Sequence, residues 1–196
     1  MQDQQQLRDA LASFNFSDEN ESQQDTNTQQ NISEDKLDRK YTFYLILTQS
    51  WTTIKVGEFD TVQQFWRIYQ YFQQLDQWDF NAKFALFAED ITPEWEHKSN
   101  LASTKIRVDK KAYQLAAGNL ILGFIGGQCV LQNHFNGLIF GNKQNGPIIE
   151  IWVDYCDNKD LDLKMNSWII QTLKAKPQNT IKFIPFKNKQ EADTKK

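Results

Sequence analysis

The chain has little of what marks secreted, membrane-spanning or metal-binding proteins. Its 196 residues include two cysteines, Cys129 and Cys156, which are not at the spacing of a zinc site. No apolar run reaches the length of about 18 residues that a membrane helix needs, and the N-terminus is too polar for a signal peptide. We therefore expect a soluble protein of the cytoplasm, or of cytoplasm and nucleus. Reduced thiols are favoured there over a disulfide.

Signatures of common enzyme classes are also missing. The sequence has no G-x-x-x-x-G-K-[ST], G-x-S-x-G or H-E-x-x-H, and its two histidines lie far apart. Asp90, Glu94 and Glu96 offer a conceivable acid–base pair, but acidic side chains in a polar loop are far more often solvated. We expect neither catalysis nor a bound cofactor or metal.

Positive charge is scarce overall, with a net charge of −3, but it is unevenly placed. Residues 1–36 carry two basic and eight acidic side chains, so the remaining chain carries 20 basic and 17 acidic ones, or +3. A mildly basic domain suits a few phosphates and not a long nucleic-acid strand.

Composition also divides the chain. Residues 1–36 are rich in Gln, Asn, Asp and Ser, which predicts a disordered acidic tail. Four apolar residues between positions 7 and 14 share a helical face, and they form either a transient partner helix or residual apolar spots. We expect the folded domain over residues 37–190 and a flexible end over 191–196.

The apolar content of 40% supplies a core, and its spacing predicts the elements. Helices are expected from an N-cap at Asp60-Thr61 through Phe72, from Asp109 to Gly126, and from Leu161 to Pro177. Strands are expected at 41–47, 53–56 (closed by Gly57), 84–87, 105–108 and 180–186, with a hairpin of 135–140 and 147–155. No βαβ rhythm occurs, so the predicted class is α+β, an antiparallel sheet with helices on one face.

Aromatic residues, in contrast, are plentiful, and two tryptophans lie in predicted loops. Trp95 and Glu96 follow Pro93, and Trp51 follows the first strand. An indole face beside a two-oxygen carboxylate suits a flat, electron-poor base with two adjacent N–H donors, such as alkylated guanine. Trp is more often a core residue, but stacking platforms need this loop placement.

These residues belong to longer motifs with a known likeness. Over about residues 37–190 the chain resembles the eukaryotic translation initiation factor 4E family, which binds the 7-methylguanosine cap of mRNA. The motifs that carry the resemblance are Phe59–Trp66 with Tyr69, Phe84–Phe87, Ile91–Glu96, Leu122–Gly126, Ile149–Trp152 and Cys156–Asn158. The resemblance implies a curved antiparallel sheet, three helices on its convex face and a cap slot on its concave side.

The resemblance also implies roles for individual residues at the base. Trp51 and Trp95 would sandwich the methylated guanine, and Glu96 would accept hydrogen bonds from its N1–H and N2 amine. Trp152 would lie near the N7-methyl group, although a core tryptophan on a strand is an equal reading. The interval from Trp51 to Phe59 is about two residues shorter than usual, so that loop must differ.

The implied phosphate contacts are fewer than in the family. Lys143 matches the main basic position and Lys105 is a supplement, whereas Asn145 and Ile148 stand where further basic residues are typical. Residues 194–196 are a further candidate. We therefore expect weaker cap binding that depends less on the triphosphate.

Partner binding is implied on the opposite surface. Val62 and Trp66 match the apolar anchors for an initiation factor 4G-like scaffold or a 4E-binding protein, and a monomer is expected outside that complex. Gly118 and Asn119 depart from the family's second helix. Three functions stay open: recruitment of mRNA to initiation, cap-binding repression, and an interaction module without cap affinity.

Overall fold

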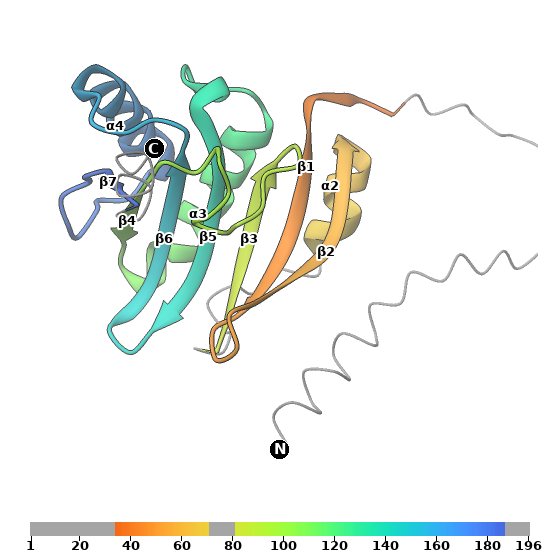
Figure 1. The fold of residues 1–196 in the computed structure, drawn as a ribbon, viewed down its shortest axis with the longest axis horizontal. Helices are drawn as coiled ribbons and strands as arrows, with labels where there is room; N and C mark the ends of the chain where they lie inside the picture. The colour runs from red at the N-terminus through yellow and green to blue at the C-terminus, as the bar shows by residue number, and fades with distance from the viewer. Residues whose placement is uncertain (1–33, 71–80, 187–196) are drawn as a thin grey trace, which may run out of the picture. The chain divides into compact units, whose positions relative to one another are not determined.

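A seven-stranded antiparallel sheet organises the computed structural model, which describes residues 34–70 and 81–186. The strand order is β2-β1-β3-β5-β6-β4-β7, and every neighbouring pair is antiparallel. The strands are β1 (Lys36–Leu47), β2 (Thr52–Thr61), β3 (Ala82–Ala88), β4 (Ala102–Arg107), β5 (Phe135–Lys143), β6 (Gly146–Val153) and β7 (Ile184–Pro185). The predicted α+β class is confirmed (Figure 1).

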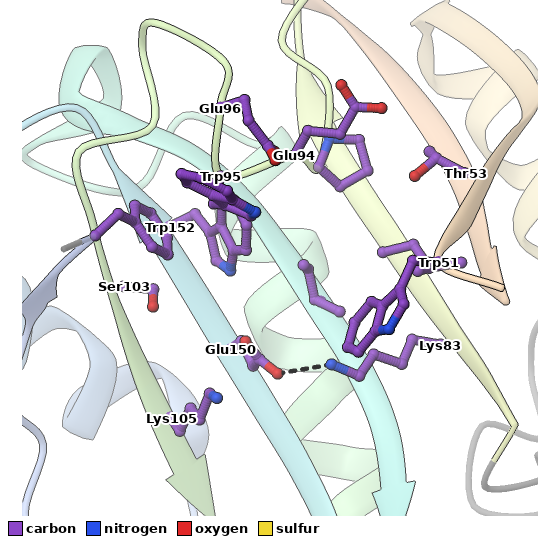
Figure 2. Close-up of a pocket in the computed structure, with 14 residues that line it drawn as sticks. Trp51, Thr53, Lys83, Glu94, Trp95, Glu96, Ser103, Lys105, Glu150 and Trp152 are labelled. Carbon is purple, nitrogen blue, oxygen red and sulfur yellow. Dashed lines mark hydrogen bonds and ion pairs between the residues drawn. The ribbon is translucent and has the colours of Figure 1, made fainter. Parts of the chain in front are cut away.

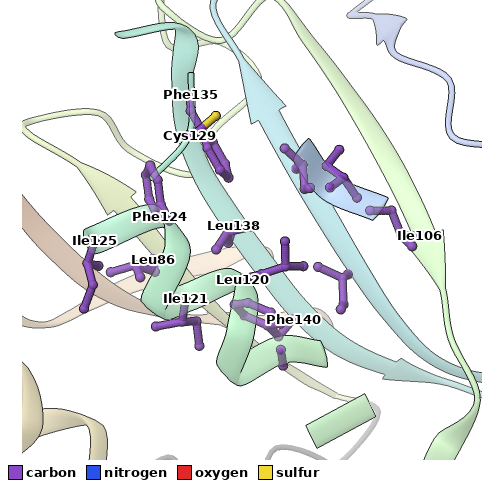
Figure 3. Packing of buried hydrophobic residues seen from close by; sticks show 14 of the residues in the cluster. Leu86, Ile106, Leu120, Ile121, Phe124, Ile125, Cys129, Phe135, Leu138 and Phe140 are labelled. Atoms are coloured by element: carbon purple, nitrogen blue, oxygen red, sulfur yellow. The ribbon is translucent and has the colours of Figure 1, made fainter. Parts of the chain in front are cut away.

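Three α-helices of the described ranges cover one face of this sheet: α2 (Val62–Tyr69), α3 (Lys110–Ile125) and α4 (Lys159–Leu173). Their apolar sides meet the sheet in one large core. For example, the ring centroid of Phe124 on α3 lies 4.1 Å from that of Phe135, and the Phe124 ring packs edge-to-face with Tyr41. Figure 3 shows how Leu120 and Ile121 continue this contact toward Leu86 and the strands below.

Local capping fixes where the helices begin. The Thr61 hydroxyl accepts from the Gln64 amide at 3.3 Å, and the Gln64 side chain accepts from the Asp60 amide at 3.1 Å. The predicted capping box is therefore present in modified form: the Gln64 side chain accepts from the amide of Asp60 and not from that of the N-cap residue Thr61. Asp109 caps α3 through the Lys111 amide, and Gly126 ends it as predicted. Phe72, the last residue of the first predicted helix, lies outside the described residues.

Several predicted boundaries are wrong. β2 does not end at Gly57 but continues to Thr61, and a Cβ at Gly57 would lie 3.0 Å from Ile68 of α2. Helix α4 ends at Leu173, because its C-cap Lys174 takes a left-handed conformation with φ 51°, so Pro177 is not what terminates it.

The last strand is also shorter than predicted, because within the expected range 180–186 only Ile184–Pro185 pairs. Asn179 takes the place of a main-chain ladder there: its side chain accepts from the Arg107 amide at 2.7 Å and donates to the Lys105 carbonyl at 2.8 Å. A side chain that satisfies the β4 edge leaves no ladder for the backbone to continue.

The sheet face away from the helices has its own small apolar cluster. Phe87 lies so close to Gly137 that a Cβ there would be 2.4 Å from its ring, and Trp152 packs edge-on to Phe87 at 5.7 Å. The buried members are Tyr44, Ile46, Ala85, Phe87, Ile91, Ile139 and Trp152. This cluster forms the floor of the site described below.

The cysteines are free and differ in environment. Burial raises the pKa of the Cys129 thiol to about 11, whereas Cys156 is exposed. The expectation of reduced thiols agrees with this placement. The first 33 residues of the predicted tail and the predicted flexible end lie outside the described residues, and β1 begins at Lys36, one residue before the predicted start of the domain.

Candidate functional site

A cavity of about 570 Å³ opens on the sheet face opposite the helices. Trp51 and Trp95 stand on two sides of it, and Ile46, Ile139 and Trp152 line its floor (Figure 2). Trp51 lies in the turn after β1 and Trp95 in the connection after β3, and because β1 and β3 are antiparallel, these two connections leave opposite ends of the sheet. The structure thus brings together the tryptophans singled out from the sequence.

Trp51 occupies an unusual backbone position. It ends the β1–β2 turn with φ 53°, and 74% of its surface is exposed. A bulky residue in the left-handed region costs on the order of 1–3 kcal/mol and persists only where the surroundings hold it there. Thr48 anchors this turn through its amide, which donates to the Asn81 carbonyl at 2.8 Å. An exposed indole at such a position is available for stacking.

The loop that carries Trp95 is fixed from behind by a buried amide. Asn100 is fully buried, and its side chain donates to the Thr92 carbonyl at 2.9 Å and the Glu94 carbonyl at 2.8 Å. Asn136 of β5 donates in turn to Asn100 at 3.0 Å and to the Ser99 carbonyl. Trp95 itself is 40% exposed on this held loop. Sequence reasoning missed both asparagines, because a single buried Asn carries no periodic signal, either in a loop, as at Asn100, or on a strand, as at Asn136.

Glu96 lines the cavity beside Trp95 and is exposed. Across residues 34–70 and 81–186, no salt bridge occupies its carboxylate. Glu94, two positions earlier, also lines the cavity and accepts from the Thr92 hydroxyl at 3.3 Å. Glu96 thus presents oxygen acceptors next to an indole face, as the sequence predicts.

Trp152 is both core and lining. It is 7% exposed and packs against Phe87 and against Phe186, whose ring centroid lies 4.7 Å away. Its indole Nε1 is buried and donates to no protein acceptor in the described part of the chain. The core reading of Trp152 is confirmed, and its place near an N7-methyl group stays a prediction.

An ion pair on the cavity floor escaped the sequence reasoning. Lys83 of β3 reaches Glu150 of β6 at 3.0 Å, and their side chains are 17% and 6% exposed. Lys83 crosses β5 above Gly141, where a Cβ would lie 2.9 Å from its Cγ. One signal was visible: Glu150 is the lone charge within the otherwise apolar run Pro147–Val153.

Of the basic residues predicted to contact the phosphates, one lines the cavity and another does not. Lys105 of β4 lines the cavity, opposite Glu150 in the strand register. Lys143 is the exposed last residue of β5 and does not line the cavity. Residues 194–196 lie outside the described residues. Val62 and the 46% exposed Trp66 lie on α2, across the sheet from the cavity.

The charged side chains around the cavity sum to −1, from Lys83 and Lys105 against Glu94, Glu96 and Glu150. Two exposed indoles and a carboxylate-rich rim suit a flat cationic ring, which gains from electron-rich faces. Within the described ranges, no group of three or more His, Cys, Asp or Glu is placed to hold a metal ion, and no helix is long and apolar enough to cross a membrane.

Comparison with known proteins identifies the family of this chain. The family model for eukaryotic initiation factor 4E matches residues 36–196. Eukaryotic translation initiation factor 4E of Dictyostelium discoideum is 22% identical over 142 residues, 68% of this chain and 54% of that protein. Its counterpart in Candida glabrata is 24% identical over 145 residues, 70% of this chain and 69% of that protein. The chain therefore belongs to the eukaryotic initiation factor 4E family.

Solved structures agree on the fold. The complex of C. elegans eIF4E-3 with the 4E-binding protein Mextli and cap analog has a TM-score of 0.72 at 18% identity, covering 84% of this chain and 97% of that one. Schistosome eIF4E complexed with m7GpppG and 4E-BP also has a TM-score of 0.72, covering 81% and 92%. The chain spans about half the length of the Dictyostelium relative that it matches.

Proposed function

We propose that this protein binds the 7-methylguanosine cap of mRNA in the cavity and recruits it to translation initiation through a scaffold partner. The observation that carries the proposal is the joint placement of Trp51, Trp95 and Glu96 around one cavity. Family membership and relatives described with cap analogs and 4E-binding proteins support it. The proposed role is binding without catalysis, by a monomer in the cytoplasm.

The base would lie between the two indoles. Methylation at N7 gives guanine a positive charge, and a desolvated cation on an aromatic face gains about 2 kcal/mol. The Glu96 carboxylate would accept from N1–H and the N2 amine, a pair of charge-assisted bonds that adenine cannot supply. The Trp95 amide would donate to O6, and Trp152 would lie against the methyl group.

The phosphates would leave the base toward Lys105, with Lys143 and residues 194–196 as further proposed contacts. Each lysine acts as a point charge and lacks the two-pronged grip of arginine. Weak dependence on the triphosphate follows from so few cations. A salt titration of cap-analogue affinity measures the number of phosphate contacts, and a steep slope would contradict this part of the proposal.

The partner would bind at α2, where Val62 and Trp66 are accessible. This helix and the cavity lie on opposite faces of the sheet, so both ligands fit at once. Repression of capped mRNA is a second candidate. It is favoured by Gly118 on α3, close to the Tyr69 hydroxyl of α2, where it alters the surface next to the anchors.

Tryptophan fluorescence tests cap binding directly. Titration with 7-methylguanosine triphosphate should quench emission strongly, because the ligand stacks on two indoles, whereas GTP should quench little. Absence of methyl-selective quenching would overturn cap binding and leave an interaction module on this fold.

Glu96→Ala tests the assigned carboxylate. We expect affinity for the methylated ligand to fall at least about tenfold, since two charge-assisted hydrogen bonds are lost. Glu94→Ala is the matched control, because it removes the same charge from the same loop and cavity. Equal losses in the two variants would show a general charge effect and contradict the assigned contact.

A further inference from the structure

The Lys83–Glu150 pair lies inside the proposed slot and is not explained by base stacking or by the phosphate contacts named above. Both side chains line the cavity, as do the apolar side chains of Ile139 and Trp152. Buried ion pairs contribute little net stability compared with apolar side chains of similar volume. Stability alone is therefore a weak reason to keep a carboxylate and an ammonium on an apolar floor.

The strand register places Lys83 and Glu150 close enough to pair. Lys83 pairs with Gly141 on the neighbouring strand, and Glu150 lies between Ile139 and Lys105 in the register. The missing side chain at Gly141 lets Lys83 reach across β5. Glu150 is thereby flanked by one ammonium at 3.0 Å and by a second lysine on the adjacent strand.

The position of the pair relative to the base follows from guanine chemistry. N9, which carries the ribose, lies across the ring system from N1. A base whose N1–H donates to Glu96 therefore directs its ribose and phosphates away from Glu96. Figure 2 shows Glu96 at one end of the cavity and Lys83, Glu150 and Lys105 at the other. The sugar and first phosphates thus approach the ion pair.

Glu150 changes the net charge of the cavity lining near those phosphates. With it, the Lys83 charge is matched at 3.0 Å, and the cavity lining carries −1 in total. Without it, the lining would be neutral and Lys83 would be free to attract phosphate. A fixed carboxylate favours the cationic base and opposes each added phosphate charge.

We propose that Glu150, held by Lys83, is a specificity residue that makes the slot bind methylated guanosine with little gain from additional phosphates. This inference rests on the proposed cap binding. The ligands it favours are 7-methylguanosine with one phosphate or few, relative to the triphosphate.

The test compares 7-methylguanosine mono- and triphosphate by fluorescence titration at fixed ionic strength. The measured quantity is the ratio of their dissociation constants. In the unaltered protein the triphosphate should bind no more than a few-fold tighter. In Glu150→Gln, which keeps the shape and still accepts from Lys83, its advantage should grow about tenfold because one nearby negative charge is gone.

A double-mutant cycle of Glu150→Gln with Lys83→Met distinguishes a role of the pair in ligand specificity from a role in fold stability. Lys83→Met leaves the carboxylate unmatched, so the triphosphate advantage should fall, and the double variant should return toward the starting ratio. A purely structural pair would weaken both ligands equally and leave the ratio unchanged in every variant, which overturns the proposal. Glu150→Gln alone decides the matter if Lys83→Met does not fold.

Failure of this inference is distinguishable from failure of cap binding. Methyl-selective quenching with an unchanged ratio overturns the role of Glu150 alone. No methyl-selective binding in the unaltered protein overturns cap binding and this inference with it. A strong triphosphate preference in the unaltered protein, on the order of a hundredfold, would also overturn the inference.

Discussion

Asn100 shows how one buried side chain positions a ligand contact that it does not touch. Its amide donates to two carbonyls of the Thr92–Glu94 turn, and the Trp95 indole follows directly after that turn. Without these bonds the loop would sample other conformations, and cap binding would have to order it again. The energy for that ordering comes out of the binding free energy.

We therefore expect Asn100→Ala to weaken cap-analogue binding about tenfold and to destabilise the fold by about 1–3 kcal/mol, through loss of buried hydrogen bonds. Fluorescence titration and thermal unfolding measure the two effects. Asn158→Ala is the control, because it removes the side chain that accepts from the Leu161 amide at the start of α4. Cap affinity lost equally in both variants would mean that global stability, not loop position, is responsible.

Residue-level features of the site were predictable only where chemistry shows in the local sequence. Trp51, Trp95 and Glu96 stood out because large polar-edged side chains followed predicted strands. Lys83 and Glu150 lie 67 positions apart and meet because of a strand register that no local pattern encodes. Long-range register, set by the packing of whole strands, is what the sequence reasoning lacked.

The stability of helix α2, which carries the proposed partner surface, depends on the N-cap residue that precedes it. Thr61 ends β2 and caps α2, and its hydroxyl accepts from Gln64 and donates to Glu34 at 3.1 Å. A helix of eight described residues has few hydrogen bonds of its own, so a lost cap affects much of it.

Thr61→Ala should lower the free energy of unfolding by about 1 kcal/mol, the usual effect of losing a hydroxyl cap. For a domain of this size the melting temperature should fall by about 2–4 °C. Thr61→Ser keeps the capping oxygen and should retain most of the stability. A serine variant as unstable as the alanine variant would assign the loss to the methyl group, against the capping role.

Elements were predictable in proportion to how locally they are determined. The capping pattern and apolar period located α2, and the hairpin of β5 and β6 followed from its Gly/Asn turn. Strand 180–186 failed because Asn179 satisfies the β4 edge with its side chain, an interaction between residues more than 70 positions apart. Such a contact overrides the local preference for a strand.

The whole molecule separates two proposed ligands by a packed sheet. The cavity lies over the smaller apolar cluster, and α2 packs in the larger core on the other face. A rigid core between two surfaces allows each to be changed without altering the other, provided that no shared element moves.

We therefore expect a double dissociation between the faces. Trp66→Ala should abolish recovery of the partner in a pull-down because it removes the exposed anchor of α2, while cap-analogue affinity stays within about twofold. Glu96→Ala should do the reverse, losing cap affinity while partner recovery is kept. Loss of cap affinity in Trp66→Ala would show that the two faces are coupled through the sheet. Retained partner recovery in that variant would instead place the docking surface elsewhere than on α2.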